Sequence, residues 1–550
     1  MNSPVLLEKN GNKIVVKLTS GHEQFNEALG LVRNVSRQHG GAFNPNTKLW
    51  ELPLVSFDDL TSELNGYRPD YGPMLSKWLA EVEALQSLDL NLPEVDGRTY
   101  ADHQKVGINW IVRNANSLLL DDQGLGKTMQ AAVAMRMRYE SGAARKFVII
   151  CPKAVVDVWL DELKLCFPEA TCFVLDKKRK IPNDTTIVIT HYERARRSVD
   201  DLSVWEPDMI TLDESHRVKN RQSVTAKAIS SLQPKFRLAM TGTVLPNKVE
   251  DVWFQVNWAV PGYFPDYWTW LRVYANLGNR FSKYAVSSYK NLDQLKHKIN
   301  AVSLRRTKDE VLDLPTRLFQ VRHVHMTAEQ IAVYEQIRQD LIREFDDDGN
   351  LVSPNSLTKF LRLAQAASNP QMINDEYPES TTKYDEALSL IEDTDSQVIV
   401  WSCYRYDLHR MKQILDAADI SSVLYHGDTS PAERQAAIRD FQAGKVRVFL
   451  GSPAACREGI TLTAADTMIY LNRSFNAVDR LQSQDRNYRI GQDNRCMVYD
   501  IVTAGTLDEL TLKALKGKSA MNQYAQSQTL EQEITVSAED LRYYLERAAQ

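Results

Sequence analysis

The 550-residue chain lacks three features that mark large classes of protein: paired cysteines, long apolar runs and a basic excess. Its six cysteines stand singly without a CxxC pair, which argues against a zinc site and is typical of a reducing compartment. No apolar run approaches the roughly 20 residues that span a membrane, and the first residues show no basic stretch before an apolar core. We therefore expect an intracellular, soluble protein that uses neither zinc nor a membrane.

The charge balance excludes a generally basic nucleic-acid binder. The chain has 66 Lys and Arg against 71 Asp and Glu, a net charge of −5. Any nucleic-acid site must therefore be a local basic surface. Hydrophobic residues at 43% are enough for large cores, and the length suggests roughly three or four domains.

The most informative stretch runs from Leu118 to Thr128 and reads LLLDDQGLGKT. It predicts a short buried strand, a tight loop, and a helix that begins at Lys127. Gly124 and Gly126 let the backbone bring its N–H groups against phosphate oxygens, and the helix N-terminus adds partial positive charge. Lys127 would reach the β- and γ-phosphates of a nucleotide, and the Thr128 hydroxyl would hold Mg²⁺.

This phosphate loop is incomplete, because Asp121 stands where the pattern GxxxxGK[ST] has its first glycine. A glycine-containing turn that binds nothing therefore stays open as the alternative for this stretch alone.

Two adjacent carboxylates, Asp213 and Glu214, follow an apolar strand predicted over 209–212. Ligands of open α/β sheets bind outside the carboxyl ends of the strands, so this pair suits ATP hydrolysis. Asp213 would hold Mg²⁺, and Glu214 would orient and deprotonate the attacking water. An exposed acidic turn is the alternative, although such a pair downstream of a GKT loop is much less common by chance.

Apolar runs alternate with helical patterns in two parts of the chain, which predicts the α/β class with parallel sheets flanked by helices. The predicted strands are Leu118–Leu120, Phe147–Cys151, Ile187–Thr190, Met209–Leu212 and Arg237–Met240, then Gln397–Trp401, Ser422–Tyr425, Val446–Leu450, Thr467–Leu471 and Val498–Ile501.

Five segments follow from these patterns. They are a small N-terminal α+β module (1–90), a first α/β lobe (98–300), a junction with a helical protrusion (301–380), a second α/β lobe (381–525) and a C-terminal helical tail (526–550).

Two arginines of the second lobe, Arg486 and Arg489, are three residues apart, which predicts that both project from one helix face. A guanidinium from another domain can stabilise the charge that phosphoryl transfer leaves on the equatorial oxygens. A surface salt-bridge face is the alternative for an arginine pair taken alone.

The order and wording of these motifs resemble the Swi/Snf-type ATPases of helicase superfamily two, over about residues 98–515. The resembling segments include Asp121-Asp-Gln-Gly-Leu-Gly-Lys-Thr128, Asp213-Glu-Ser-His-Arg-Val-Lys-Asn220, Arg237-Leu-Ala-Met-Thr-Gly-Thr243, Leu304-Arg-Arg-Thr-Lys308 and Asp485-Arg-Asn-Tyr-Arg-Ile-Gly-Gln492. This family also often lacks the first glycine, so Asp121 becomes a family feature rather than a defect.

The resemblance implies two tandem RecA-like lobes, ATP and Mg²⁺ as cofactors, and an active ATP hydrolase. It implies catalytic roles for Lys127, Glu214, Arg486 and Arg489, metal binding by Thr128 and Asp213, and ATP binding by Gln104, Asp122, Gly124, Leu125, Gly126, Lys127, Thr128 and Gly459. Departures from the family at Val244 and Pro246, at Ser215, and in Cys456-Arg-Glu-Gly459 leave every hydrolytic residue in place.

The resemblance also implies DNA as a partner, bound with little sequence preference and strong dependence on salt. It places Lys153, Thr190, His191, Ser402 and Thr461 near the DNA backbone. The compact motif wording looks bacterial or viral, so we expect a monomer in the cytoplasm of a bacterium or of a virus-infected host cell. Chromatin remodelling is the least expected role.

The N-terminal module adds a weaker likeness, since residues 40–53 resemble the core of the HARP module of annealing helicases. That resemblance implies DNA binding at forks or at junctions of single and double strands. Phe43 and Trp50 would stack on bases, although Trp50 fits a place in the module's core equally well.

The function that follows is a DNA-dependent ATPase that translocates on duplex DNA and remodels or reanneals forks and junctions. The enzymatic alternative is a helicase that separates strands or migrates branches. A third alternative is a DNA-binding scaffold that uses ATP only as a switch.

Overall fold

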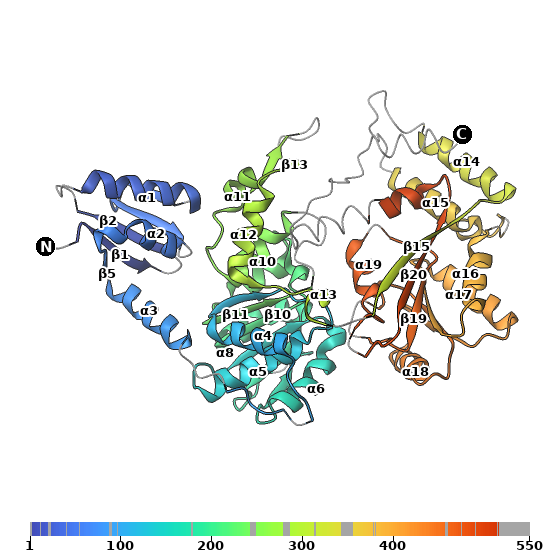
Figure 1. Ribbon diagram of the computed structural model, residues 1–550, viewed down its shortest axis with the longest axis horizontal. Helices are drawn as coiled ribbons and strands as arrows, with labels where there is room; N and C mark the ends of the chain where they lie inside the picture. The colour runs from blue at the N-terminus through green and yellow to red at the C-terminus, as the bar shows by residue number, and fades with distance from the viewer. Residues whose placement is uncertain are drawn as a thin grey trace. The chain divides into compact units, whose positions relative to one another are not determined.

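The computed structural model divides into two compact units, Met1–Thr307 and Lys308–Gln550, which are described separately below (Figure 1). It describes residues 3–10, 13–19, 24–39, 41–53, 56–86, 91–95, 97–177, 180–242, 249–278, 286–312, 315–342, 356–377, 379, 381–456, 460–474, 476–489, 491–513 and 515. Among these residues, no helix combines the length and the apolar character needed to cross a membrane.

The N-terminal module is a five-stranded sheet with the strand order β3-β4-β2-β1-β5. Alternate residues of its central strands are buried, among them Val5, Leu7, Ile14 and Val16, and they pack on the helices that cover one face. This alternation confirms the predicted α+β character. The elements are β1 (Val5–Asn10), β2 (Lys13–Leu18), α1 (Phe25–His39), β3 (Ala42–Asn44), β4 (Leu49–Pro53), α2 (Phe57–Glu63), η2 (Asn65–Tyr67), β5 (Asp70–Tyr71) and α3 (Pro73–Gln86).

The first α/β lobe is built on a seven-stranded sheet in the order β14-β6-β11-β10-β7-β9-β8, and every neighbouring pair is parallel. All five residues of β7 are buried, as expected for a strand covered by helices on both faces. The strands are β6 (Asn116–Leu119), β7 (Phe147–Cys151), β8 (Cys172–Val174), β9 (Ile187–His191), β10 (Met209–Asp213), β11 (Phe236–Met240) and β14 (Ser303–Leu304).

The helices of this lobe surround the sheet, and a short antiparallel pair of strands lies beyond it (Figure 1). They are α4 (Asp102–Arg113), α5 (Lys127–Glu140), η3 (Lys153–Val155), α6 (Val156–Cys166), α7 (Tyr192–Arg197), α8 (Val199–Trp205), η4 (Ser215–Val218), α9 (Val224–Ser231), α10 (Asp251–Ala259), α11 (Tyr267–Tyr274) and α12 (Leu292–Val302), with the strand pair β12 (Ala275–Leu277) and β13 (Val286–Tyr289).

The second unit has a six-stranded, fully parallel sheet in the order β15-β20-β19-β16-β18-β17. Separate apolar clusters cover its two faces. Its elements are α13 (Lys308–Val311), β15 (Arg317–Val324), α14 (Ala328–Ile342), α15 (Ser356–Ser368), η5 (Pro370–Met372), α16 (Lys383–Glu392), β16 (Gln397–Trp401), α17 (Arg405–Ala417), β17 (Ser422–Tyr425), α18 (Pro431–Gln442), β18 (Val448–Gly451), β19 (Ala465–Tyr470), α19 (Ala477–Gln484) and β20 (Cys496–Thr503).

The region between the lobes differs most from the prediction. The segment 301–380 was expected to form a junction and a helical protrusion, but it also supplies an edge strand to each sheet. β14 pairs with β6 in the first unit, and β15 pairs with β20 in the second. Edge strands are less buried than central ones. β15 is exposed or half-buried along most of its length and mixes polar with apolar residues, so it lacks the continuous apolar run that marks a buried parallel strand. The predicted tail at 526–550 lies outside the described residues.

Candidate active site

The phosphate-loop sequence forms the turn that its residue types predict. β6 ends at Leu119, the chain turns, and α5 begins at Lys127. Gly124 and Gly126 have φ of 89° and 78°, in the left-handed region that favours glycine. A Cβ on Gly126 would lie 2.6 Å from Gln104 Nε2, so the Gln104 amide would have to shift, while the positive φ itself favours glycine at this position.

Lys127 folds back into its own loop. Its Nζ donates to the backbone oxygens of Asp121 and Asp122 at 2.7 and 3.1 Å. The ammonium therefore lies inside the turn, held by carbonyl oxygens that phosphate oxygens can replace. Thr128 follows in the first turn of α5, where helix N–H groups have no partner within the helix.

Asp121 is fully buried and binds Arg306, a residue to which the sequence pattern assigns no separate role. Arg306 donates from Nε to Asp121 Oδ1 at 2.9 Å and from Nη2 to Oδ2 at 2.5 Å, a bidentate pair. Gln130 Nε2 contacts the same carboxylate at 3.3 Å. Asp121 therefore ties the loop to the segment that follows β14, which explains why a carboxylate can stand in place of the first glycine.

The backbone reinforces this tie. Leu120 N donates to Leu304 O at 2.8 Å, and Asp122 N donates to Arg306 O at 3.0 Å. The segment 304–306 thus continues the pairing of β14 with β6 along the start of the phosphate loop. The motif Leu304-Arg-Arg can be read from the sequence, but the pairing of its Arg306 with Asp121, 185 residues away, cannot.

Gln104 lies against the phosphate loop, with its Nε2 beside Gly126, and its role in ATP binding stays a prediction. It is nearly buried at the start of α4, and its Oε1 accepts a hydrogen bond from Ala101 N at 3.1 Å. Leu125 O, on the loop, contacts His103 Nε2 at 3.2 Å and accepts from Gln130 Nε2 at 3.0 Å. α4 is therefore packed directly on the loop, and burial lowers the pKa of His103.

Asp213 ends β10 at the carboxyl edge of the sheet, where the sequence predicted it. Trp159 Nε1 donates to its Oδ2 at 2.9 Å, and the Tyr192 hydroxyl donates to its backbone oxygen at 2.6 Å. Burial and the neighbouring charge of Glu214 raise the pKa of Asp213 to about 6, against the opposing effects of the Trp159 hydrogen bond and the Lys127 charge. A cation placed beside this carboxylate would stabilise its charged form and lower its pKa.

Glu214 adopts a left-handed backbone conformation with φ 53°, which is uncommon for a residue other than glycine and often marks a functional site. Its Oε1 accepts from Gln123 Nε2 at 3.2 Å, and its Oε2 accepts from the Thr241 hydroxyl at 3.3 Å. His216 Nδ1 lies 3.2 Å from the same Oε2. Glu214 is thus held between the phosphate loop and the end of β11. The motifs of the sequence include Gln123, Thr241 and His216, but their residue types and spacing assign them no individual role.

These groups fit Mg²⁺ and a nucleoside triphosphate. Lys127 and the start of α5 offer positive charge to phosphates, while Thr128 and Asp213 offer hard oxygen ligands. Among the described residues no cluster of three or more His, Cys, Asp or Glu is placed to hold a metal ion. A divalent cation here would therefore depend on phosphate and water oxygens as well, as Mg²⁺ commonly does.

In the second unit, the two predicted catalytic arginines follow a helix rather than lying on it. α19 ends at Gln484, so the prediction that Arg486 and Arg489 share a helix face is wrong. Leu462 N donates to Arg486 O at 2.9 Å, and this bond draws the chain away from the helical path.

Both guanidinium groups are bound within their own unit. Arg486 is 2% exposed and donates from Nε to Gln482 O at 2.8 Å. Arg489 donates from Nη1 to the Thr461 hydroxyl at 2.8 Å. Burial, together with the charge of Arg486, lowers the pKa of Arg489 to about 10, so this group is still cationic at neutral pH.

The arginine segment is also anchored to the start of its unit. Lys308, 3% exposed, donates from Nζ to Asp485 Oδ1 at 2.7 Å and to Tyr488 O at 2.6 Å. Lys308 is only two residues from Arg306, which holds the phosphate loop of the first unit. Residues 306–308 therefore supply one residue, Arg306, that binds the phosphate loop and another, Lys308, that binds the arginine segment.

The residues predicted to contact DNA divide by exposure. Thr190 and Ser402 are at most 1% exposed, and their hydroxyls donate to Leu175 O and to Asp407 Oδ2, both at 2.8 Å. Both hydroxyls are therefore occupied by protein partners, and a role for Thr190 or Ser402 in DNA binding stays a prediction. Lys153 in η3 is exposed.

His191 and Thr461 retain some solvent access but already have partners. His191 is the N-cap of α7 and accepts a hydrogen bond from Arg194 N at 3.3 Å. Thr461 accepts from Arg489, as noted above. A role for either in DNA binding stays a prediction, as does that of Lys153.

Phe43 and Trp50 face each other across the pair β3 and β4, with ring centroids 5.5 Å apart. Phe43 is 46% exposed, whereas Trp50 packs against the module's apolar core. Of the two, only Phe43 offers a substantial exposed surface for stacking.

Two of the sequence departures fall outside the described residues, namely 243–248 and 457–459, and with them the predicted ATP-binding residue Gly459. Ser215 is described and buried, and its hydroxyl donates to Gln255 Oε1 at 3.1 Å. This bond ties η4, directly after Glu214, to α10, and a hydroxyl at this position therefore has a structural use.

Two family models match the chain in sequence order. Residues 103–372 match the SNF2-related domain, and residues 382–491 match the helicase conserved C-terminal domain. The matches begin at residue 103, so the likeness of the N-terminal module to the HARP module stays a prediction.

Curated relatives come from bacteria and from eukaryotes. YwqA of Bacillus subtilis, provisionally named an ATP-dependent helicase/translocase, is 27% identical over 89% of this chain and 56% of its own length. The ATP-dependent helicase fft1 of Schizosaccharomyces pombe is 25% identical over 75% of this chain and 51% of its own. The ISWI chromatin-remodeling complex ATPase ISW1 of Saccharomyces cerevisiae is 26% identical over 76% and 40%.

The chain spans about half the length of the curated relatives it matches. Their similar identities do not separate a bacterial from a eukaryotic origin, so the bacterial or viral expectation stays a prediction. The solved SWI2/SNF2 ATPase core of Sulfolobus solfataricus in complex with dsDNA is 25% identical, covering 83% of this chain and 97% of that one, with a TM-score of 0.40. The two domain models carry the assignment.

Proposed function

The chain belongs to the Swi/Snf-type ATPases of helicase superfamily two, and from this premise we propose that it is a DNA-dependent ATPase that translocates on double-stranded DNA. We further propose that it uses ATP hydrolysis to remodel or reanneal forks and junctions. We propose DNA as the partner because the names of other relatives include a probable ATP-dependent DNA helicase and a helicase-DNA-binding protein. The ATP site itself rests on the geometry of the first unit.

One contact carries the proposal for hydrolysis: Gln123 of the phosphate loop donates to the Glu214 carboxylate at 3.2 Å. This contact supports the proposal because Glu214, the candidate base, then lies beside the loop proposed to hold the triphosphate. The two motifs are 91 residues apart in the chain, so only a fold of this kind brings them together.

Each residue has a chemical task in this proposal. Lys127 and the N-terminus of α5 bind the phosphates, and Glu214, oriented by Gln123 and Thr241, takes a proton from the attacking water. Thr128 and Asp213 would hold Mg²⁺, which neutralises charge on the phosphate oxygens. Arg486 and Arg489 are the candidates for stabilising the charge that develops on the transferred group.

The proposal is tested by the steady-state ATPase rate across single-stranded, duplex, forked and junction DNA at fixed ionic strength. We expect the duplex-containing substrates to stimulate hydrolysis most. Equal rates with and without every DNA would overturn the proposal and favour the ATP-switched scaffold, which is expected to hydrolyse ATP in single turnovers.

A second assay separates translocation from unwinding. A translocase displaces the third strand of a DNA triplex without separating the underlying duplex. Free unwinding of simple duplexes would instead favour the alternative of a helicase that separates strands or migrates branches. In either case Phe43→Ala is expected to weaken binding to forks more than to duplex if the N-terminal module binds DNA.

A further inference from the structure

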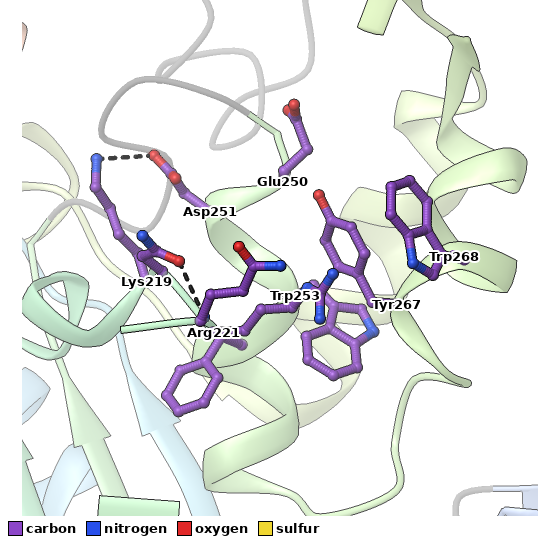
Figure 2. A pocket seen from close by; sticks show the side chains of 10 residues that line it. Lys219, Arg221, Glu250, Asp251, Trp253, Tyr267 and Trp268 are labelled. Atoms are coloured by element: carbon purple, nitrogen blue, oxygen red, sulfur yellow. Dashed lines mark hydrogen bonds and ion pairs between the residues drawn. The ribbon is translucent and has the colours of Figure 1, made fainter. Parts of the chain in front are cut away.

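A cavity of about 650 Å³ in the first lobe is lined by none of the residues of the phosphate loop (Figure 2). It forms where the chain after η4 meets α10 and the start of α11. The lining residues are Lys219, Asn220, Arg221, Gln222, Glu250, Asp251, Trp253, Phe254, Tyr267 and Trp268. Neither the domain models nor the proposed hydrolytic mechanism assigns a use to it.

Aromatic side chains, those of Trp253, Phe254, Tyr267 and Trp268, form one wall of this cavity. The rings of Trp253 and Tyr267 meet edge to face with centroids 5.6 Å apart, and those of Tyr267 and Trp268 with centroids 5.3 Å apart. Trp253 is turned inward, because its Nε1 donates to Pro265 O at 2.9 Å. Trp268 is 40% exposed and presents a large aromatic surface at the rim.

Arg221 extends over this wall. Its guanidinium carbon lies 4.0 Å from the centroid of Tyr267 and 5.9 Å from that of Trp268 (Figure 2). Within the part of the chain that the structure describes, Arg221 forms no ion pair with a carboxylate. A guanidinium is planar and can stack on aromatic and other flat groups, so Arg221 could hold a second flat group against this wall.

The charges of the lining cancel. Lys219 and Arg221 are balanced by Glu250 and Asp251. Lys219 pairs with Asp251 at 3.0 Å, and Glu250 accepts a hydrogen bond from the Tyr289 hydroxyl at 2.6 Å. An acidic ligand therefore gains no net attraction, and the cation's place over Tyr267 is already taken by Arg221. The chemistry that fits best is a neutral, flat ring.

We propose that Arg221, Tyr267 and Trp268 form a binding site for an unpaired base of a DNA strand. Stacking on Trp268 and on the Arg221 guanidinium supplies the affinity, as in other sites for single strands, where each stacked base contributes about 1–3 kcal/mol. The side chains of Asn220 and Gln222 line the same space and offer hydrogen bonds to base edges. Stacking tolerates every base, so little sequence preference is expected.

The site also has a structural route to the catalytic glutamate. α10 forms one wall through Asp251 and Trp253, and its Gln255 accepts a hydrogen bond from Ser215, the residue after Glu214. Lys219 connects the end of the same segment to α10. A base in the cavity would therefore rest on the helix that braces the catalytic turn.

This inference extends the proposed DNA-dependent activity, and its test is chosen to be independent of hydrolysis. The full chain is titrated, without nucleotide, against a fluorescein-labelled 20-nucleotide single strand, the same strand with abasic sites, and a duplex of equal length. Trp268→Ala is expected to weaken binding of the intact single strand by about 5- to 150-fold, and Arg221→Ala by a smaller factor.

The controls separate stacking from folding and from charge. Trp268→Phe should restore most of the affinity, and Arg113→Ala, an exposed arginine at the end of α4, should leave it unchanged. The abasic strand should bind the Trp268→Ala variant as well as the unaltered chain. Duplex-stimulated ATPase should persist in Trp268→Ala, so the two proposals fail separately.

Three outcomes would overturn the inference. They are an equal loss on single strand and duplex by Trp268→Ala, no loss on either, and competition for the site by a polyglutamate peptide but not by an unlabelled single strand. The last would assign the cavity to an acidic peptide.

Discussion

The phosphate-loop site of the first unit and the arginine segment of the second differ in how ready their residues are for chemistry. In the first, Glu214 is oriented by side chains of the loop and of β11, and Lys127 lies inside the turn it serves. In the second, Arg486 and Arg489 are bound to backbone and hydroxyl oxygens of their own unit. The first site is assembled within one lobe, whereas in the second the two guanidinium groups are bound to protein oxygens rather than available to a ligand.

This difference bears on how hydrolysis would be controlled. A guanidinium bound to carbonyl oxygens must exchange those partners before it can stabilise a phosphoryl group. Desolvation of such a charge without a replacement partner is unfavourable, so the exchange is expected only when a phosphate is offered. We therefore expect the arginine segment to control the rate of hydrolysis and the phosphate-loop site to bind the nucleotide.

The largest expected effect comes from the assembled site. Lys127→Ala is expected to remove DNA-stimulated ATPase activity, and Glu214→Gln to lower kcat by about 10²- to 10⁴-fold while ATP binding persists, because only proton abstraction is lost. The measurements are steady-state ATPase rates and nucleotide titration. Lys105→Ala and Glu140→Gln, exposed residues of the same lobe, are the matched controls. Full activity of Glu214→Gln would show that another group activates the water.

The next largest effect is expected from the arginine segment of the second unit. Arg489→Ala is expected to lower kcat by roughly 10³-fold, the scale of a lost transition-state arginine, with little change in ATP affinity. Arg495→Ala, an exposed arginine a few residues on, should have no effect. Because the pKa of Arg489 is lowered only to about 10, its charge should add no pH dependence to the rate between pH 7 and about 9. A loss confined to ATP affinity would make Arg489 a ground-state binding residue.

The anchor on Asp121 is expected to affect stability more than chemistry. Arg306→Ala leaves a fully buried carboxylate without its main partner, which should destabilise the first unit by about 3–5 kcal/mol in chemical denaturation. Asp121→Asn combined with Arg306→Ala should recover part of that loss. The exposed pair of Lys105 and Asp102 is the control, and breaking it should change stability by at most about 1 kcal/mol. Equal effects at both pairs would contradict the anchoring role.

The smallest effects are expected from two residues predicted to lie near DNA, the exposed Lys153 and the buried Thr190. Lys153→Ala should weaken duplex binding several-fold and reduce the slope of log affinity against log salt by about 0.9, the contribution of one phosphate contact. Thr190→Val should leave DNA affinity unchanged and lower stability by about 1 kcal/mol, since it removes a buried hydrogen bond. A strong loss of DNA affinity in Thr190→Val would instead show that the Thr190 hydroxyl takes part in DNA binding.

Local chemistry was largely predictable. Continuous apolar runs predicted β7 and β16 to the residue, because strands buried on both faces need no polar alternation. The bounds of the edge strand β17 also match the prediction, although it is only partly buried. The glycines and the lysine predicted the turn into α5, because a left-handed backbone and a helix start impose those residue types locally. The acid pair at the end of β10 followed from the same sheet logic.

What the sequence determined by itself was therefore the class of the fold, the place of the phosphate loop and the identity of its chemical groups. Tertiary structure alone decided which groups support them. The partner of Asp121 lies 185 residues away, Thr190 and Ser402 are buried by neighbours remote in the chain, and the arginine segment leaves its helix because Arg486 O pairs with Leu462. Each of these depends on contacts between distant segments, and residue type and spacing carry no direct record of such contacts.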